Sequence, residues 1–182
     1  NLSAWLGECS DAAVLEVDDT GDWRFVHDKL REQLLADLSP EMAKQLHRIV
    51  AEALEATYAD APEYTLRLVR HWGLAEDYVK EAHYSMRAGE QSLALSFASD
   101  ALTYFRRAAQ HARGDEQQAR ILVSIGQAYL LLGDYAQALE ALGSGLELAR
   151  KIDDRRRIAD SLSWLGQISV NKGDYPPAEA EA

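Results

Sequence analysis

The chain has 182 residues, 47% hydrophobic and 27% charged, which excludes a chain that is disordered for lack of apolar residues. Its 19 lysines and arginines against 30 acidic residues give a net charge of −11, so we expect neither nucleic acid nor a membrane surface as a partner. The single cysteine, Cys9, excludes an internal disulfide and favours a cytoplasmic location.

Residues 1–38 predict a helix, a β-hairpin and a second helix. A short helix is expected around Leu2 to Cys9, followed by two β-prone runs at 14–17 and 23–26 that flank a polar turn. Helical spacing resumes from His27 to Leu38. This order of elements indicates the C-terminal part of a winged-helix-like module.

Residues 39–112 predict a helical linker and degenerate repeats. Apolar residues recur at helical spacing after Ser39-Pro40 and again after Pro62. The stripe at 101–108 aligns with the one at 138–145, which makes it the second helix of a repeat. We therefore expect Gly89 to end the first helix of that repeat and the second helix to begin near Glu90.

Residues 113–182 contain a repeat with a period of 40 residues. Six identities share this offset: Gly126/Gly166, Gln127/Gln167, Gly133/Gly173, Asp134/Asp174, Tyr135/Tyr175 and Ala138/Ala178. Each unit predicts two helices, with Gly126 leaving room for a neighbouring helix. Gly133 is expected to cap the first helix in the left-handed conformation, and Asp134 with Gln137 to form a capping box for the second. In the second copy Pro176 and Pro177 fall in the first turn of that helix.

This pattern resembles the tetratricopeptide repeat. The matching positions are Gly126, Tyr129, Gly133, Asp134, Tyr135 and Ala138. The period of 40 exceeds the usual 34 and is similar to the extended repeat of signalling scaffolds, while Ser169 stands where the first copy has Tyr129. The resemblance implies a mainly α fold, a right-handed α-solenoid of helical hairpins, with the last repeat truncated.

Residues 23–55 resemble the connection between winged helix and helical repeats in signal-transduction ATPases with numerous domains, a class that includes bacterial regulators. In one branch the histidine of a Met-His-Asp motif contacts bound ADP; here the sequence is Val26-His27-Asp28. The resemblance implies that His27 and Asp28 bind ADP or ATP only within a longer parent protein, and we expect no cofactor in this chain. Alternatively, both side chains simply cap the helix.

We expect structural roles for the remaining histidines and for the run Arg155 to Arg157. The four histidines lack the spacing of a zinc site and are expected at surface or interhelical positions: His47, His71, His83 and His111. The arginine run lies near Lys151, Asp153 and Asp154, and we expect a solvated, salt-bridged connection rather than an anion site.

The sequence holds no Gly-rich phosphate loop, paired metal-ligand spacing or nucleophile elbow, so we expect no enzyme. The leading interpretation is a protein-protein interaction scaffold that binds a protein or peptide in a concave groove. Trp164, Leu165 and Ile168 are expected to be partly uncovered, which would allow a homo-oligomer through the truncated C-terminal repeat. The alternative is a segment that senses the nucleotide state of an ATPase and inhibits it. The acidic balance disfavours winged-helix DNA binding.

Overall fold

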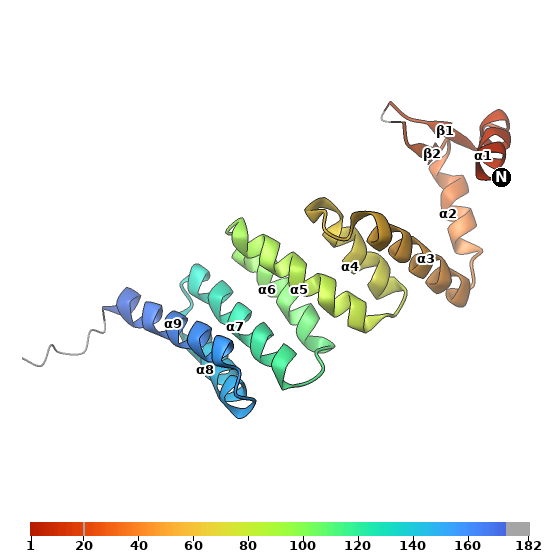
Figure 1. Cartoon of the computed structure of the whole chain (residues 1–182). Coiled ribbons are helices and arrows are strands. Elements are labelled where there is room, and N and C mark those ends of the chain that lie inside the picture. The colour runs from red at the N-terminus through yellow and green to blue at the C-terminus, as the bar shows by residue number, and fades with distance from the viewer. Residues whose placement is uncertain (20, 174–182) are drawn as a thin grey trace, which may run out of the picture. The chain divides into compact units, whose positions relative to one another are not determined.

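The structure is a computed structural model that describes residues 1–19 and 21–173. In these residues it contains nine α-helices, one short 3₁₀ helix and one two-stranded sheet, which confirms a mainly helical chain (Figure 1). Contacts divide the chain into two compact units, Asn1–Leu46 and His47–Ala182.

The first unit has the predicted order of helix, hairpin and helix. Its elements are α1 (Leu2–Asp11), β1 (Leu15–Val17), β2 (Trp23–Phe25) and α2 (Asp28–Ala36). The Asn1 side chain caps α1 by accepting a hydrogen bond from the backbone N–H of Ser3. Across the antiparallel hairpin Glu16 lies opposite Arg24, and their side chains form an ion pair of 2.8 Å. The winged-helix assignment stays a prediction.

The second unit is built from helices. They are α3 (Pro40–Tyr58, whose first residues belong to the first unit), η1 (Pro62–Tyr64), α4 (Thr65–Leu74), α5 (Tyr78–Ala94), α6 (Ala98–Gln110), α7 (Asp115–Leu132), α8 (Tyr135–Lys151) and α9 (Arg155–Lys172). From α4 onwards each helix packs against the next, and α7 also contacts α5 and α9. Because the connections are short, successive helices run in opposite directions (Figure 1).

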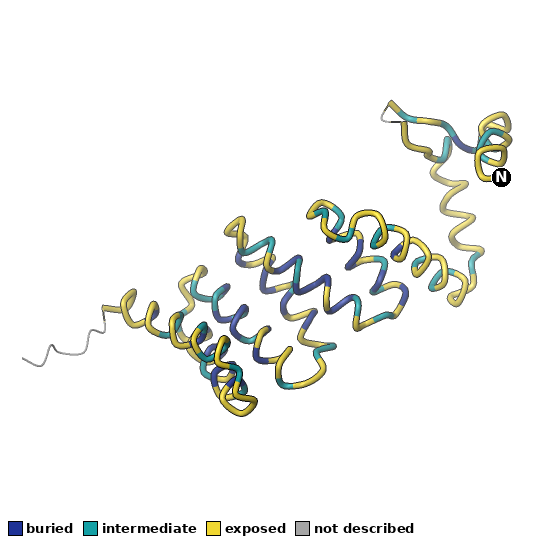
Figure 2. The backbone as a smooth tube through the Cα atoms, viewed as in Figure 1, coloured by how far each residue is buried: buried dark blue, intermediate teal, exposed yellow. Residues whose placement is uncertain are grey.

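Three apolar clusters follow one another along this unit. The first includes Leu68, Trp72 and Tyr84, and the second joins Met86 to Phe105 and Ile121. The third is built from Val123, Ala138, Leu142 and Ile168. Buried residues accordingly line the facing sides of α4 to α8 (Figure 2). Each helix therefore buries its apolar face against its neighbours in the chain.

Four helix connections share one design. In each, a residue with positive φ is followed by a residue whose N–H donates to the carbonyl five positions earlier, as in a Schellman motif. The positive-φ residues are Glu76, Ser96, Gly133 and Asp153. The predicted left-handed cap at Gly133 (φ 75°) is confirmed, and so is the N-cap at Asp134, which accepts from the N–H of Gln137 at 3.2 Å. The Gln137 side chain donates to Glu140 instead of completing the capping box.

The predicted end of a helix at Gly89 is wrong. Gly89 lies inside α5, and α6 begins at Ala98 rather than near Glu90. A Cβ atom at Gly89 would collide with the ring of Phe105, so the glycine is needed for the approach of α6. Ser96, with φ 63°, takes the capping position between α5 and α6 that Gly133 holds between α7 and α8. The predicted alignment of 101–108 with 138–145 agrees with this arrangement.

The end of the described chain corrects another expectation. Ile168 is only 1% exposed because it packs against Val123 and Leu142, whereas Trp164 and Leu165 are half-buried as expected. Gly173 has φ 75° and caps α9. The expectations for Pro176, Pro177 and the rest of the second copy after Gly173 lie outside the described residues.

Candidate functional site

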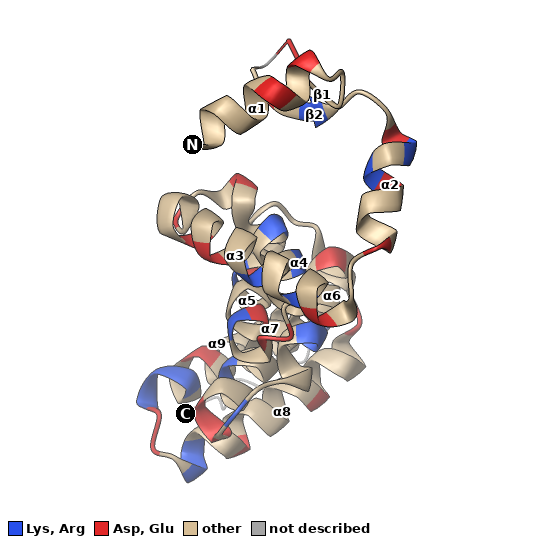
Figure 3. Cartoon of the chain, turned by 90° about the vertical axis from the view of Figure 1, so that its right-hand side faces the viewer, with Lys and Arg blue, Asp and Glu red and all other residues tan. Residues whose placement is uncertain are grey.

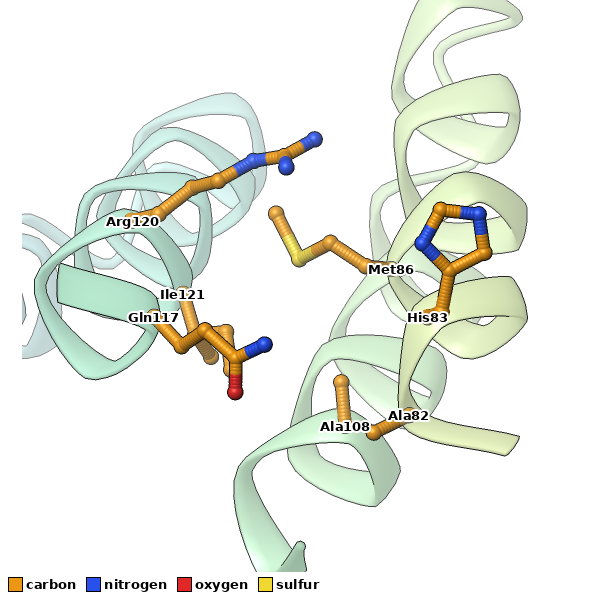
Figure 4. A pocket seen from close by; sticks show the side chains of 7 residues that line it. All are labelled: Ala82, His83, Met86, Ala108, Gln117, Arg120 and Ile121. Carbon is orange, nitrogen blue, oxygen red and sulfur yellow. The ribbon is translucent and has the colours of Figure 1, made fainter. Parts of the chain in front are cut away.

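Two adjoining hollows lie along α5, α7 and α9 and share Gln117 and Arg120. The first, between α5 and α7, has a volume of about 60 Å³ and is lined by Ala82, His83, Met86, Ala108, Gln117, Arg120 and Ile121 (Figure 4). The second, between α7 and α9, measures about 450 Å³ and is lined by Glu116, Gln117, Arg120, Asp154, Arg156 and Arg157. The eleven residues that line the two hollows are together called the α5–α7–α9 surface.

The first hollow has an apolar floor and a polar rim. Met86 reaches from α5 towards α7, and the Arg120 side chain extends above it from the opposite side (Figure 4). Met86 and Ile121 belong to the second apolar cluster, so the floor is continuous with the core. A cavity of about 150 Å³ accommodates benzene. The first hollow therefore has room for a small apolar side chain, and not for an aromatic cofactor.

His83 supplies the titratable group of this hollow. Burial lowers the pKa of the imidazole below its usual 6.5, and the positive charges of Arg87, Lys80 and Arg120 lower it further. The ring is therefore neutral at pH 7, with one nitrogen able to donate a hydrogen bond and the other able to accept one. These are the two functions needed to bind the N–H and C=O groups of a peptide.

The second hollow is bordered by charged side chains. Arg120 pairs with Glu90 of α5, and Arg157 pairs with Asp160 at 2.9 Å. Asp154 caps α9 by accepting from the N–H of Arg157 at 3.0 Å. No hydrogen bond or ion pair of the Arg156 side chain is found in the residues described. The ion pair of Arg157 is therefore with Asp160 inside α9, and not with Asp153 or Asp154 as the predicted salt-bridged connection would require, while Arg156 borders the hollow.

The residues singled out from the sequence lie in the first unit. His27 is exposed at the start of α2, and its side chain makes no capping hydrogen bond. Asp28 is exposed and lies 3.6 Å from Arg31, so it is a first-turn acid rather than the N-cap. Asp28 lines a shallow hollow with Glu16 and Arg24, and His27 does not. Their proposed part in binding a nucleotide stays a prediction.

No sequence pattern singled out Met86, Gln117 or Arg120 of the α5–α7–α9 surface, and only structural roles were predicted for His83 and the arginine run. His83 and Arg120 are 37 residues apart, as are Gly89 and Gly126, so they occupy equivalent positions on α5 and α7. Aligning the helices at a spacing of 37 residues would have shown that His83 and Arg120 share a helix face. The spacing of 40 residues between the six identical pairs differs from it.

Across residues 1–19 and 21–173 no group of three or more His, Cys, Asp or Glu side chains could hold a metal ion. Nor does any helix there have the length and apolar character to cross a membrane. The chain matches no protein-family model and no curated protein sequence.

Proposed function

We propose that this chain is a non-enzymatic protein-interaction module, built as a right-handed α-solenoid of tetratricopeptide-like hairpins. The serial packing of α4 to α9 supports this proposal, because solenoid repeats contact mainly their neighbours. The spacing of 37 residues supports it further. It relates the contact of Gly89 with Phe105 to that of Gly126 with Leu142, so two successive hairpins close in the same way.

The observation that carries the binding proposal is the combination of an apolar floor and a polar rim in adjoining hollows. A small apolar side chain of a partner peptide fits the hollow over Met86 and Ile121. His83 and Gln117 offer hydrogen bonds to the peptide backbone. Arg120, although paired with Glu90, is exposed and able to attract a carboxylate at the second hollow.

A peptide library displayed on phage and selected against the whole chain tests this function. We expect enriched peptides that share a small apolar residue. Their affinity should fall at least about tenfold in Gln117→Trp, which covers the first hollow from an exposed position, and in Arg120→Glu. Arg150→Glu, an exposed change on α8, is the control. The proposal is wrong if no peptide is enriched, or if all three variants bind the enriched peptides equally well.

A second candidate function is nucleotide sensing within a cytoplasmic signal-transduction ATPase, with the helical unit inhibiting the enzyme. The exposed His27 imidazole, free of a capping bond, favours it, because it could donate to a phosphate. In a parent protein carrying the ATPase domain, His27→Ala should weaken ADP binding and raise basal activity. Unchanged ADP affinity in that variant would remove this candidate. We propose no cofactor for the present chain.

A further inference from the structure

A second pair of adjoining hollows lies on α4 and α6. They measure about 530 and 580 Å³ and share Gly73 and Arg107. Arg70 and Tyr104 border the first hollow, while Tyr78, Arg106 and His111 border the second. We call the two together the α4–α6 cleft. It is lined mainly by α4 and α6 and shares no residue with the α5–α7–α9 surface.

The α4–α6 cleft is basic in an acidic chain. Helices α4 and α6 carry four arginines, Arg67, Arg70, Arg106 and Arg107, against a single acid, Asp100. The whole chain, in contrast, has a net charge of −11, and its acidic residues are spread along the ribbon (Figure 3). Three of these arginines border the cleft. A local concentration of positive charge in a hollow attracts anions of matching size.

An ion pair between a buried carboxylate and a half-exposed arginine lines the cleft. The Glu81 carboxylate is 5% exposed and pairs with Arg107, and its other oxygen lies 4.0 Å from Nε2 of His111. The His111 ring is stacked on Tyr78 with centroids 4.4 Å apart. A Cβ atom at Gly73 would lie 2.8 Å from Oε1 of Glu81 and 2.9 Å from Nη2 of Arg107. Gly73 therefore makes room for the pair, which holds Arg107 in place.

The pair leaves positive charge at the opening of the cleft. The Glu81 carboxylate offsets the positive charge of Arg107, and among the described residues it forms no ion pair with Arg70 or Arg106. Arg106 donates to the neutral hydroxyl of Tyr129 at 2.6 Å, and Arg70 forms no ion pair with any residue that the structure describes. Leu66 and Leu74, exposed by 52% and 46%, add apolar surface beside Arg70. The cleft thus presents arginines and apolar side chains together.

We propose that the α4–α6 cleft binds an acidic peptide segment of a partner protein, with its carboxylates at Arg70 and Arg106 and its apolar side chains against Leu66 and Leu74. Guanidinium groups match carboxylates in charge and geometry. A nucleic acid duplex carries a negative charge about every 1.7 Å and would extend beyond the cleft, over a chain whose net charge is −11. A short peptide confines its charge to the cleft, so the observations favour a peptide.

Fluorescence anisotropy with a labelled peptide of alternating glutamate and leucine tests the inference on the whole chain. We expect saturable binding of this acidic peptide, and its affinity should fall with added salt. The matched peptide, in which glutamine replaces each glutamate, should bind at least about tenfold more weakly. Arg70→Gln, at an exposed position, should weaken binding of the acidic peptide about tenfold. Arg155→Gln removes one positive charge at an exposed position on α9, and it should leave the affinity for the acidic peptide unchanged.

The inference is overturned by the absence of saturable binding, by equal affinity for the two peptides, or by equal weakening in Arg70→Gln and Arg155→Gln. Tighter binding of a single-stranded oligonucleotide than of the acidic peptide would also reject it. The result for the α4–α6 cleft is independent of the result of the peptide-library experiment on the α5–α7–α9 surface. Peptides selected from the library should bind Arg70→Gln normally, and the acidic peptide should bind Gln117→Trp normally.

Discussion

A Cβ atom placed on Gly126 would lie 2.5 Å from Cγ of Leu142, so α7 and α8 meet without room for a side chain at this position. Leu142 is fully buried in the third apolar cluster and has little freedom to move away. The same relationship joins Gly89 of α5 to Phe105 of α6. The glycines thus set how closely the helices of each hairpin approach.

Gly126→Ala should lower the free energy of unfolding by about 1 to 3 kcal/mol, because overpacking outweighs the better helix propensity of alanine. Gly143→Ala is the matched control, since no described atom lies within 4 Å of a Cβ at that position in α8. It should be neutral or stabilising by up to about 1 kcal/mol. Urea denaturation of both variants measures the difference. Equal stabilities would show that the contact with Leu142 does not limit the packing.

Ser96→Gly should stabilise the chain by about 0.5 to 1 kcal/mol. Ser96 has φ 63°, a conformation that costs a residue with a Cβ about 1 kcal/mol and costs glycine little. The exchange in the opposite direction, Gly133→Ser, should destabilise by a similar amount. A Cβ at Gly133 meets nothing within 4 Å, so only the backbone conformation is tested there. Thermal melts would contradict this explanation if both exchanges shifted the melting temperature in the same direction.

These two positions show what the sequence could and could not predict about the fold. The cap at Gly133 followed from local chemistry, because glycine favours the left-handed conformation and Asp134 favours an N-cap. Serine at position 96 carries no such signal, and its conformation is fixed by the packing of α5 against α6. Gly89 was therefore mistaken for the cap, although it lies seven residues earlier in α5.

The candidate sites were less predictable than the helices. The pair of Glu81 with Arg107 joins residues 26 positions apart on different helices, so it depends on how α5 packs against α6. The hollow between His83 and Arg120 depends in the same way on α5 and α7. Helical periodicity predicts which face of a helix is apolar, and it does not predict which polar residues of two helices meet.

Glu81→Gln should cost about 2 kcal/mol of stability, because the Glu81 carboxylate, 5% exposed, accepts a charge-assisted hydrogen bond from Arg107 that a neutral amide makes more weakly. Glu90→Gln is the control, since Glu90 pairs with Arg120 where both side chains are 45% exposed. An exposed pair contributes about 1 kcal/mol or less. Urea denaturation at neutral pH compares the two variants. A loss at Glu90 as large as that at Glu81 would contradict the argument from burial.

Acidification should destabilise the second unit through His71, which contacts His47. Nδ1 of His71 on α4 lies 3.0 Å from Nδ1 of His47 on α3. The pKa of His71 lies below its usual 6.5 because burial disfavours the imidazolium, and His47, Arg70 and Arg67 add repulsion. Burial and nearby arginines lower the pKa of His83 as well.

The sign of the effect follows from proton binding. Between pH 7.5 and 5.5 the unfolded chain, with histidines near pKa 6.5, binds more protons than the folded chain, so the free energy of unfolding falls as the pH falls through this window. Denaturation in urea at both pH values measures the drop. His71→Gln should reduce it, and the double variant with His83→Gln should reduce it further. If the wild-type chain were equally stable at both pH values, or if His71→Gln left the drop unchanged, protonation of His71 would not control the stability of the chain.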